Sequence, residues 1–120
     1  MNEEAETWWK QALKDLDTAR QLLGMDNYEG AAFFAQQSAE KGLKALHIDR
    51  FRELKKTHDL VLLARDLGLP KRLIDLCKEL SPAYIYTRYP DVVPVENVEK
   101  VSKELLGYAE EIVRWIEGRR

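Results

Sequence analysis

One stretch limits what this chain can fold into more than any other. Residues 27–47, NYEGAAFFAQQSAEKGLKALH, fit a single long helix, because apolar residues recur at three- and four-residue steps. At about 100° per residue, these apolar side chains occupy more than one face of the helix. A helix of this kind cannot lie on a surface. The sequence therefore predicts a central helix with other helices packed around it.

A stripe of long polar side chains is the unusual feature of this helix. It consists of Gln36, Gln37, Glu40, Lys41 and Lys44. On a central helix, such groups need hydrogen-bonding partners or a solvent-filled groove, which makes the stripe a candidate ligand-binding surface. The simpler interpretation, which the residue types favour, is an exposed i, i+4 ion pair between Glu40 and Lys44, worth roughly 0.2–0.5 kcal/mol.

The remaining periodicity predicts an all-α fold, an up-and-down bundle of four to five helices. The first helix covers residues 3–23, and a short turn makes it antiparallel to the central helix. Asp26 is the predicted N-cap of the central helix, and Thr57 is that of a short third helix. The later boundaries are set by glycine and proline, with Gly68 ending the third helix, Pro70 in the first turn of a fourth, and Pro94 opening the last helix.

Composition restricts the class of protein. The 120 residues, 45% hydrophobic and 33% charged, fit a single domain spanning residues 1–120. A net charge of −2 gives no global attraction to nucleic acid, and no apolar run approaches the ~20 residues of a membrane span. Cys77 has no partner for an intramolecular disulfide and is expected to be a small apolar filler. We expect a cytoplasmic protein without membrane contact.

An aromatic and charged cluster lies between prolines near residue 90. It contains Tyr84, Tyr86, Arg88, Tyr89 and Asp91. Tyrosine rings can stack on bases and Arg88 can donate two hydrogen bonds to a phosphate, which is typical of a nucleotide site. The alternative is a structural corner with buried rings, in which Arg88 pairs with Asp91.

His58 is the other candidate for chemistry. A histidine that titrates near neutrality, close to Arg52, Lys55 and Lys56, could act as general acid or base in phosphodiester cleavage. A capping or packing role is the commoner use of such a residue. The histidines and Cys77 lack metal-ligand spacing, so we expect neither a metal nor a cofactor.

Several of these segments together resemble the HEPN domain. They are the paired tryptophans Trp8 and Trp9, AxxFAQQSAEKGLKAL in the central helix, THDL at residues 57–60 and YxxxRYPD at residues 84–91. The resemblance covers nearly the whole chain. It implies a helical bundle that often dimerises. It also implies one of two roles: a subunit that binds a nucleotide or completes the substrate pocket of a minimal nucleotidyltransferase, or a metal-independent ribonuclease toxin.

The ribonuclease relatives use an arginine followed after four to six residues by a histidine. Arg88 is followed at those distances by Val93, Pro94 and Val95, so its segment supplies no histidine. Arg52 and His58 have the required spacing, but they lie in a different part of the chain from the family's catalytic pair. A tyrosine two residues after the histidine, modified in some toxin pairs, is replaced by Leu60.

We therefore expect a non-catalytic HEPN protein that binds a nucleotide or acts as the partner subunit of a minimal nucleotidyltransferase. The first alternative is a ribonuclease that acts on RNA through Arg52 and His58, and the second is a purely structural helical dimer. Trp8, Trp9 and Trp115 supply more aromatic surface than one core of this size needs, so we also expect a homodimer.

Overall fold

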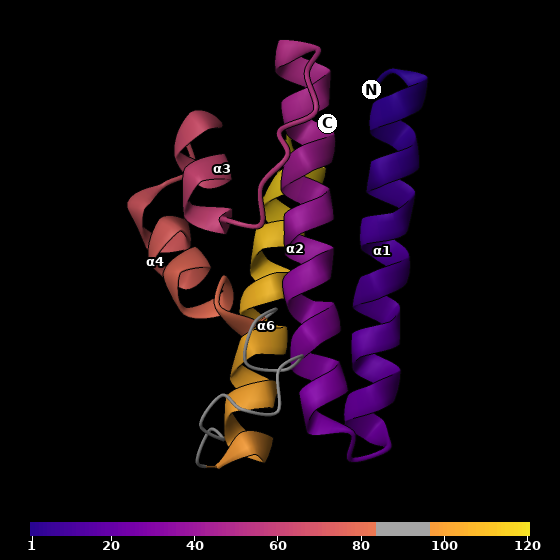
Figure 1. The fold of residues 1–120 in the computed structure, drawn as a ribbon, viewed down its shortest axis with the longest axis vertical. Helices are drawn as coiled ribbons and strands as arrows, with labels where there is room; N and C mark the ends of the chain where they lie inside the picture. Colours follow the sequence, from indigo (N-terminus) through magenta and orange to yellow (C-terminus); the bar gives the residue numbers. More distant parts are fainter. Residues whose placement is uncertain (84–96) are drawn as a thin grey trace.

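The computed structural model describes residues 1–83 and 97–120, and within these ranges the chain forms five helices and no strand. The predicted all-α fold is confirmed (Figure 1). The helices are α1 (Glu3–Gly24), α2 (Tyr28–Phe51), α3 (Leu60–Asp66), α4 (Lys71–Leu80) and α6 (Val98–Glu117).

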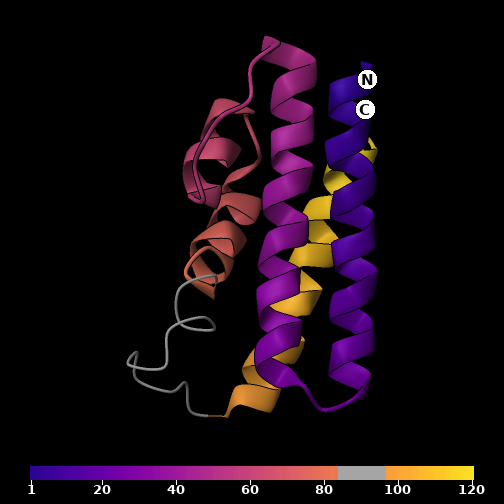
Figure 2. The ribbon, with the colours of Figure 1, turned by 45° about the vertical axis from the view of Figure 1, so that its right-hand side comes forward.

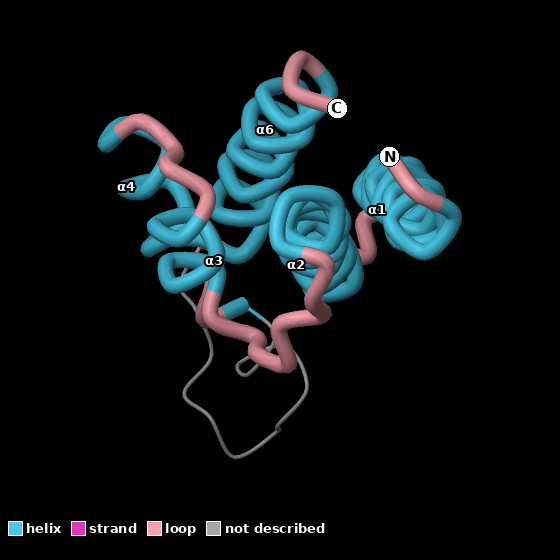
Figure 3. Tube along the Cα trace, turned by 90° about the horizontal axis from the view of Figure 1, so that it is seen from above, coloured by secondary structure: helices cyan, strands magenta, loops and turns pink. Residues whose placement is uncertain are grey.

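The predicted central helix is α2. Seen from above, it lies between α1 on one side and α3 and α6 on the other (Figure 3). Its 24 residues span about 36 Å at the usual helical rise, close to the 39 Å longest extent of the molecule. Fully buried apolar side chains occur on several of its sides, among them Ala31, Ala35, Leu43, Ala45 and Leu46.

The other helices pack around α2 in two groups. α1 runs antiparallel to α2, and α6 runs in the same direction as α2, so these three long helices lie side by side (Figures 1 and 2). The shorter α3 and α4 cover one flank of this group (Figure 1). The two chain ends lie near each other at one end of the bundle (Figure 2).

Close packing of the long helices depends on Gly42. A Cβ atom at this position would lie 3.0 Å from Cδ1 of Ile116 on α6 and 3.7 Å from Cζ3 of Trp9 on α1. The missing side chain therefore lets α2 approach both neighbours. Trp9 is 2% exposed, whereas the adjacent Trp8 is only partly buried, so the two tryptophans divide between core and surface.

Two predicted helix caps are wrong by one or two residues. The N-cap of α2 is Asn27, whose Oδ1 accepts from the Gly30 amide at 3.0 Å, while Asp26 adopts a φ of 60° and accepts from the Tyr28 hydroxyl. The N-cap of α3 is Asp59, whose Oδ1 accepts from the amides of Val61 and Leu62. In both cases the residue next to the first turn has the shorter path to the unpaired amides.

The central helix ends four residues later than predicted, and Pro70 is the N-cap of the fourth helix, although the sequence predicts it in the first turn. α2 continues past His47 to Phe51, because His47 and Ile48 are buried against the bundle, and it ends at Arg52, which takes a left-handed φ of 55°. Gly68 has a φ of +73° between α3 and α4, and Pro70 directly precedes α4. Pro94 lies outside the described residues.

Cys77 on α4 is fully buried, as predicted for an apolar filler. Desolvation, with a smaller contribution from the negative charge of Asp59, raises the pKa of its thiol to about 12. Within residues 1–83 and 97–120, none of the helices has the length and apolar character needed to span a bilayer.

Candidate functional site

A buried carboxylate organises the polar stripe of α2. Glu40 is 3% exposed, and its two oxygens accept hydrogen bonds from three side chains. Gln36 Nε2 and His58 Nδ1 donate to Oε1 at 3.1 and 2.9 Å, and Lys44 Nζ donates to Oε2 at 3.0 Å. A carboxylate so far from water is tolerated only with such partners.

The stripe continues the network along the helix. Gln37 Nε2 donates to Gln36 Oε1 at 2.7 Å, so Gln37, Gln36 and Glu40 form a relay of hydrogen bonds. Lys44 is 6% exposed, and its ammonium also lies 5.5 Å from the ring centroid of Trp8. No buried side-chain nitrogen or oxygen in the described ranges lacks a hydrogen-bond partner. The residue types favour an exposed Glu40–Lys44 pair. This prediction is wrong, because both side chains are buried.

Lys41 does not belong to this network. Its ammonium binds Asp15 on α1, whose second oxygen accepts from Gln11 Nε2 at 2.8 Å. Asp15 is buried, and sequence reasoning missed it. A signal for it was present in its position on the apolar face of the first helix, between Ala12 and Leu16.

His58 joins the buried network to the surface. Its side chain is 55% exposed, and its backbone carbonyl accepts from the Ser81 hydroxyl at the end of α4. Because a carboxylate can only accept, the ring must carry a proton on Nδ1 to bind Glu40. That contact orients the ring, so that its Nδ1 edge faces Glu40. His58 is therefore a positioned imidazole and not a helix cap.

Arg52, the proposed catalytic partner of His58, does not lie beside it in the fold. It follows α2, twelve residues after Glu40, which corresponds to about 18 Å along the helix axis. Since His58 is bound to Glu40, a single copy of the chain does not bring Arg52 and His58 together.

Other predicted site residues have separate roles or cannot be placed. His47 is buried, with Nδ1 2.9 Å from the carbonyl oxygen of Glu53 and its ring against that of Phe51. In the described part of the chain, no group of three or more His, Cys, Asp or Glu residues could hold a metal ion. The predicted nucleotide cluster lies outside the described residues: Tyr84, Tyr86, Arg88, Tyr89 and Asp91.

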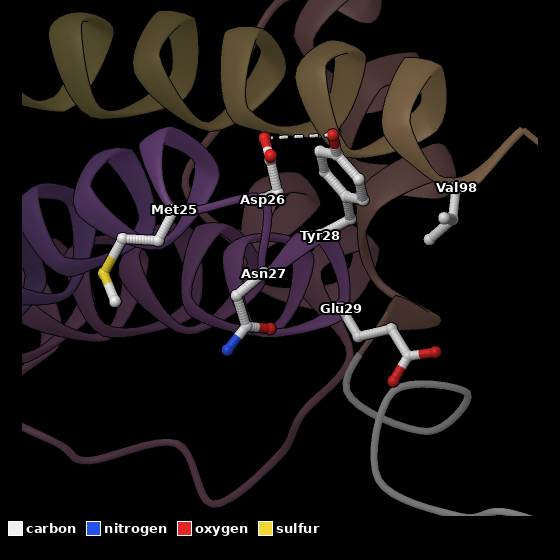
Figure 4. Close-up of a pocket in the computed structure, with 6 residues that line it drawn as sticks. All are labelled: Met25, Asp26, Asn27, Tyr28, Glu29 and Val98. Atoms are coloured by element: carbon white, nitrogen blue, oxygen red, sulfur yellow. Dashed lines mark hydrogen bonds between the residues drawn. The ribbon is translucent and has the colours of Figure 1, made fainter.

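Described side chains also line hollows on the surface. One, of about 470 Å³, lies at the turn between α1 and α2, where Met25, Asp26, Tyr28 and Glu29 surround it (Figure 4). Desolvation and the hydrogen bond to Asp26 raise the pKa of Tyr28 to about 12, so its hydroxyl stays a donor. Two further hollows flank α6. One faces α4, and the other faces α1.

Comparison with known proteins identifies relatives along nearly the whole chain. The family model of the HEPN domain matches residues 5–119. TT1696 from Thermus thermophilus is 32% identical, with a TM-score of 0.90 over 99% of this chain and 100% of that one. ST0689, described as an archaeal HEPN homologue, is 31% identical, with a TM-score of 0.81 over 99% and 98%. A HEPN domain protein, tm0613 from Thermotoga maritima, is 26% identical, with a TM-score of 0.75 over 93% and 95%. No curated protein matches.

The buried network makes a prediction about stability. Glu40→Gln removes the charge that balances Lys44, which leaves an ammonium buried without a counterion, and should lower the free energy of unfolding by ~3–5 kcal/mol. The matched control is Glu104→Gln on α6, which breaks the exposed i, i+4 pair with Lys100 and should cost no more than ~0.5 kcal/mol. Urea denaturation of both variants measures the difference. Equal small losses would contradict a structural role for the buried pair.

Proposed function

This chain belongs to the HEPN domain family, and from that membership we propose that it is a non-catalytic HEPN protein that binds a nucleotide or serves as the partner subunit of a minimal nucleotidyltransferase. One observation carries the proposal. The exposed ring of His58 is held by the buried carboxylate of Glu40 at 2.9 Å, so a rigid network supports a polar group at the surface.

The surroundings of His58 favour an anionic ligand. The connection between α2 and α3 carries three further cations, Arg52, Lys55 and Lys56. Of these three, Lys55 alone forms an ion pair with a side chain of the described ranges, that of Asp66 at 3.8 Å. Within α2 itself, the lysines of the polar stripe are already paired with Asp15 and Glu40. A ligand phosphate would therefore be recognised from the connection and not from the helix.

Arg88 and Tyr89 are the other residues that we propose to contact the ligand. A guanidinium can donate two parallel hydrogen bonds to a phosphate, whereas lysine offers a point charge, and a tyrosine ring can stack on a base. Both residues belong to the YxxxRYPD segment that follows α4, and Asp91 closes the same motif. Their assignment rests on the motif and on residue chemistry.

Nucleotide binding is tested with variants of the two proposed contact residues. Arg88→Lys should weaken ATP binding roughly ten- to hundredfold while leaving the unfolding temperature unchanged, because a charge-assisted hydrogen bond is worth ~1.5–3 kcal/mol. His58→Ala should weaken it in the same direction, whereas Lys103→Ala, which removes an exposed cation on α6, should have no effect. Isothermal calorimetry with ATP, GTP, CTP and UTP measures the affinities. If Arg88→Lys lowers stability and leaves binding intact, Arg88 is structural.

The proposal includes a homodimer. Large apolar side chains remain exposed at four separate places in the described chain: Leu13, Met25, Phe51 and Leu62. Trp8 is also only partly buried. Singly exposed apolar residues are common on monomers, so the dimer is proposed mainly from membership of a family that often dimerises. Light scattering at micromolar concentration should give twice the 14.0 kDa chain mass; a monomer under these conditions rules out the dimer.

Metal-independent RNA cleavage is the second candidate, and a specific observation favours it. A carboxylate bound to one ring nitrogen of an exposed histidine is the arrangement that orients a general acid or base in many hydrolases. Glu40 and His58 have this arrangement. Since Arg52 is distant from His58 within one chain, cleavage would need Arg52 from a second copy.

The two candidate functions predict different rates of RNA hydrolysis. We expect little RNA hydrolysis by the purified protein in the presence of EDTA. If hydrolysis is substantial and falls ~10²–10⁴-fold in both His58→Ala and Arg52→Ala, the ribonuclease is the correct function. Mixing the two inactive variants should then restore activity through mixed dimers, because each copy would supply the residue that the other lacks.

A further inference from the structure

A second candidate site lies in the hollow between α4 and α6. It measures about 420 Å³ and is lined by Arg72 and Leu73 from α4 and by Glu111, Arg114 and Trp115 from α6. The hollow takes its residues from the first turn of α4 and the C-terminal half of α6, whereas His58 contacts Ser81 at the opposite end of α4. This hollow is therefore separate from the site proposed above.

Charge distinguishes this hollow from the two others described above. At the α1–α2 turn, Asp26 and Glu29 line the hollow without any cation. Between α1 and α6, Arg20 and Arg114 are balanced by Glu110 and Glu117, and Arg114 lines both hollows that flank α6. Between α4 and α6, Arg72 and Arg114 face the single carboxylate of Glu111. This hollow alone among the three attracts an anion.

The arginines of this hollow are available to a ligand. Arg72 is paired with Glu111, but their side chains are 70% and 40% exposed, and such pairs contribute little, so a phosphate can replace the carboxylate. Arg114 has no ion pair with any residue in the ranges 1–83 and 97–120. Arg119 lies with its Cζ 4.3 Å from the ring centroid of Trp115, so it covers one face of that ring and leaves the other face for a ligand.

We propose that this hollow binds an anionic ligand that carries phosphate and a planar ring, as a nucleotide does. Arg72 and Arg114 bind the phosphate oxygens through paired hydrogen bonds, for which the guanidinium is suited. Trp115 stacks on the ring of the ligand, and Leu73 forms the apolar floor. The volume lies in the range of small-molecule sites.

Tryptophan fluorescence during titration with ATP tests this site. Binding should quench Trp115, and Trp115→Phe should abolish the signal, which separates it from Trp8 and Trp9. Arg72→Ala and Arg114→Ala should each weaken this binding at least about tenfold. The matched control is Arg20→Ala, an arginine of the neighbouring hollow that is paired with Glu110 and should leave the affinity unchanged. Thermal unfolding of each variant checks that it is folded.

The ligand class is tested with parts of the nucleotide. Adenosine and tripolyphosphate should each bind more weakly than ATP, because each supplies only part of the contacts. The inference is overturned if ATP gives no Trp115 signal, if Arg114→Ala binds ATP as the unaltered protein does, or if a polyglutamate peptide binds the same arginines more tightly than ATP does. The last result would identify a surface for acidic proteins.

The test of this hollow is independent of the test of the function proposed above. His58→Ala and Arg88→Lys should leave the Trp115 signal unchanged. Calorimetric binding that depends on Arg88 without a Trp115 signal would disprove only the hollow, and the reverse result would disprove only the site at His58 and Arg88.

Discussion

Glu40 places a carboxylate in the middle of the bundle, and the surrounding structure must supply the charge and the hydrogen bonds that this buried group needs. Moving an isolated carboxylate out of water costs several kcal/mol, and the cost is offset only by charge and hydrogen bonds at close range. Lys44 supplies the charge one helical turn away, and Gln36 supplies a hydrogen bond from the turn before. The third donor, His58, comes from eighteen residues further along the chain, so the connection between α2 and α3 must return along α2 to deliver it.

This requirement links the fold to the site. The Ser81 hydroxyl donates to the His58 carbonyl and accepts from the Leu60 amide, so the end of α4 holds the start of α3 beside α2. A histidine fixed at both its backbone and its ring loses little further freedom when it binds a ligand. The two lysines of the polar stripe on α2 differ from His58, because Lys41 and Lys44 are already paired with carboxylates of the bundle. The charged groups of the polar stripe are therefore already paired within the bundle, and Glu40 links them to His58.

The helices could be predicted well from the sequence because their signals are local. Periodicity placed the central helix, and Gly68 and Pro70 marked the corner between α3 and α4. The cap of α2 was misassigned because Asp26 and its neighbour are both good capping residues, and only backbone conformation decides between them. The burial of the Glu40–Lys44 pair depends on residues distant in sequence, so the spacing of four residues could not distinguish it from an exposed pair. The buried aspartate of α1 and the hollow between α4 and α6 were missed for the same reason.

Local charge, and not the net charge of −2, decides what this surface can bind. Many of the carboxylates that make the chain acidic are paired, as in Lys71–Asp75 and Arg20–Glu110, so they contribute little field beyond a few ångströms. Arginines without a buried counterion remain at the α4–α6 hollow, and exposed cations remain on the connection that ends at His58. The two regions lie at opposite ends of α4, because its first turn lines the hollow and Ser81 at its end contacts His58. If both proposed sites bind ligands, a ligand at one would therefore leave the cations of the other exposed.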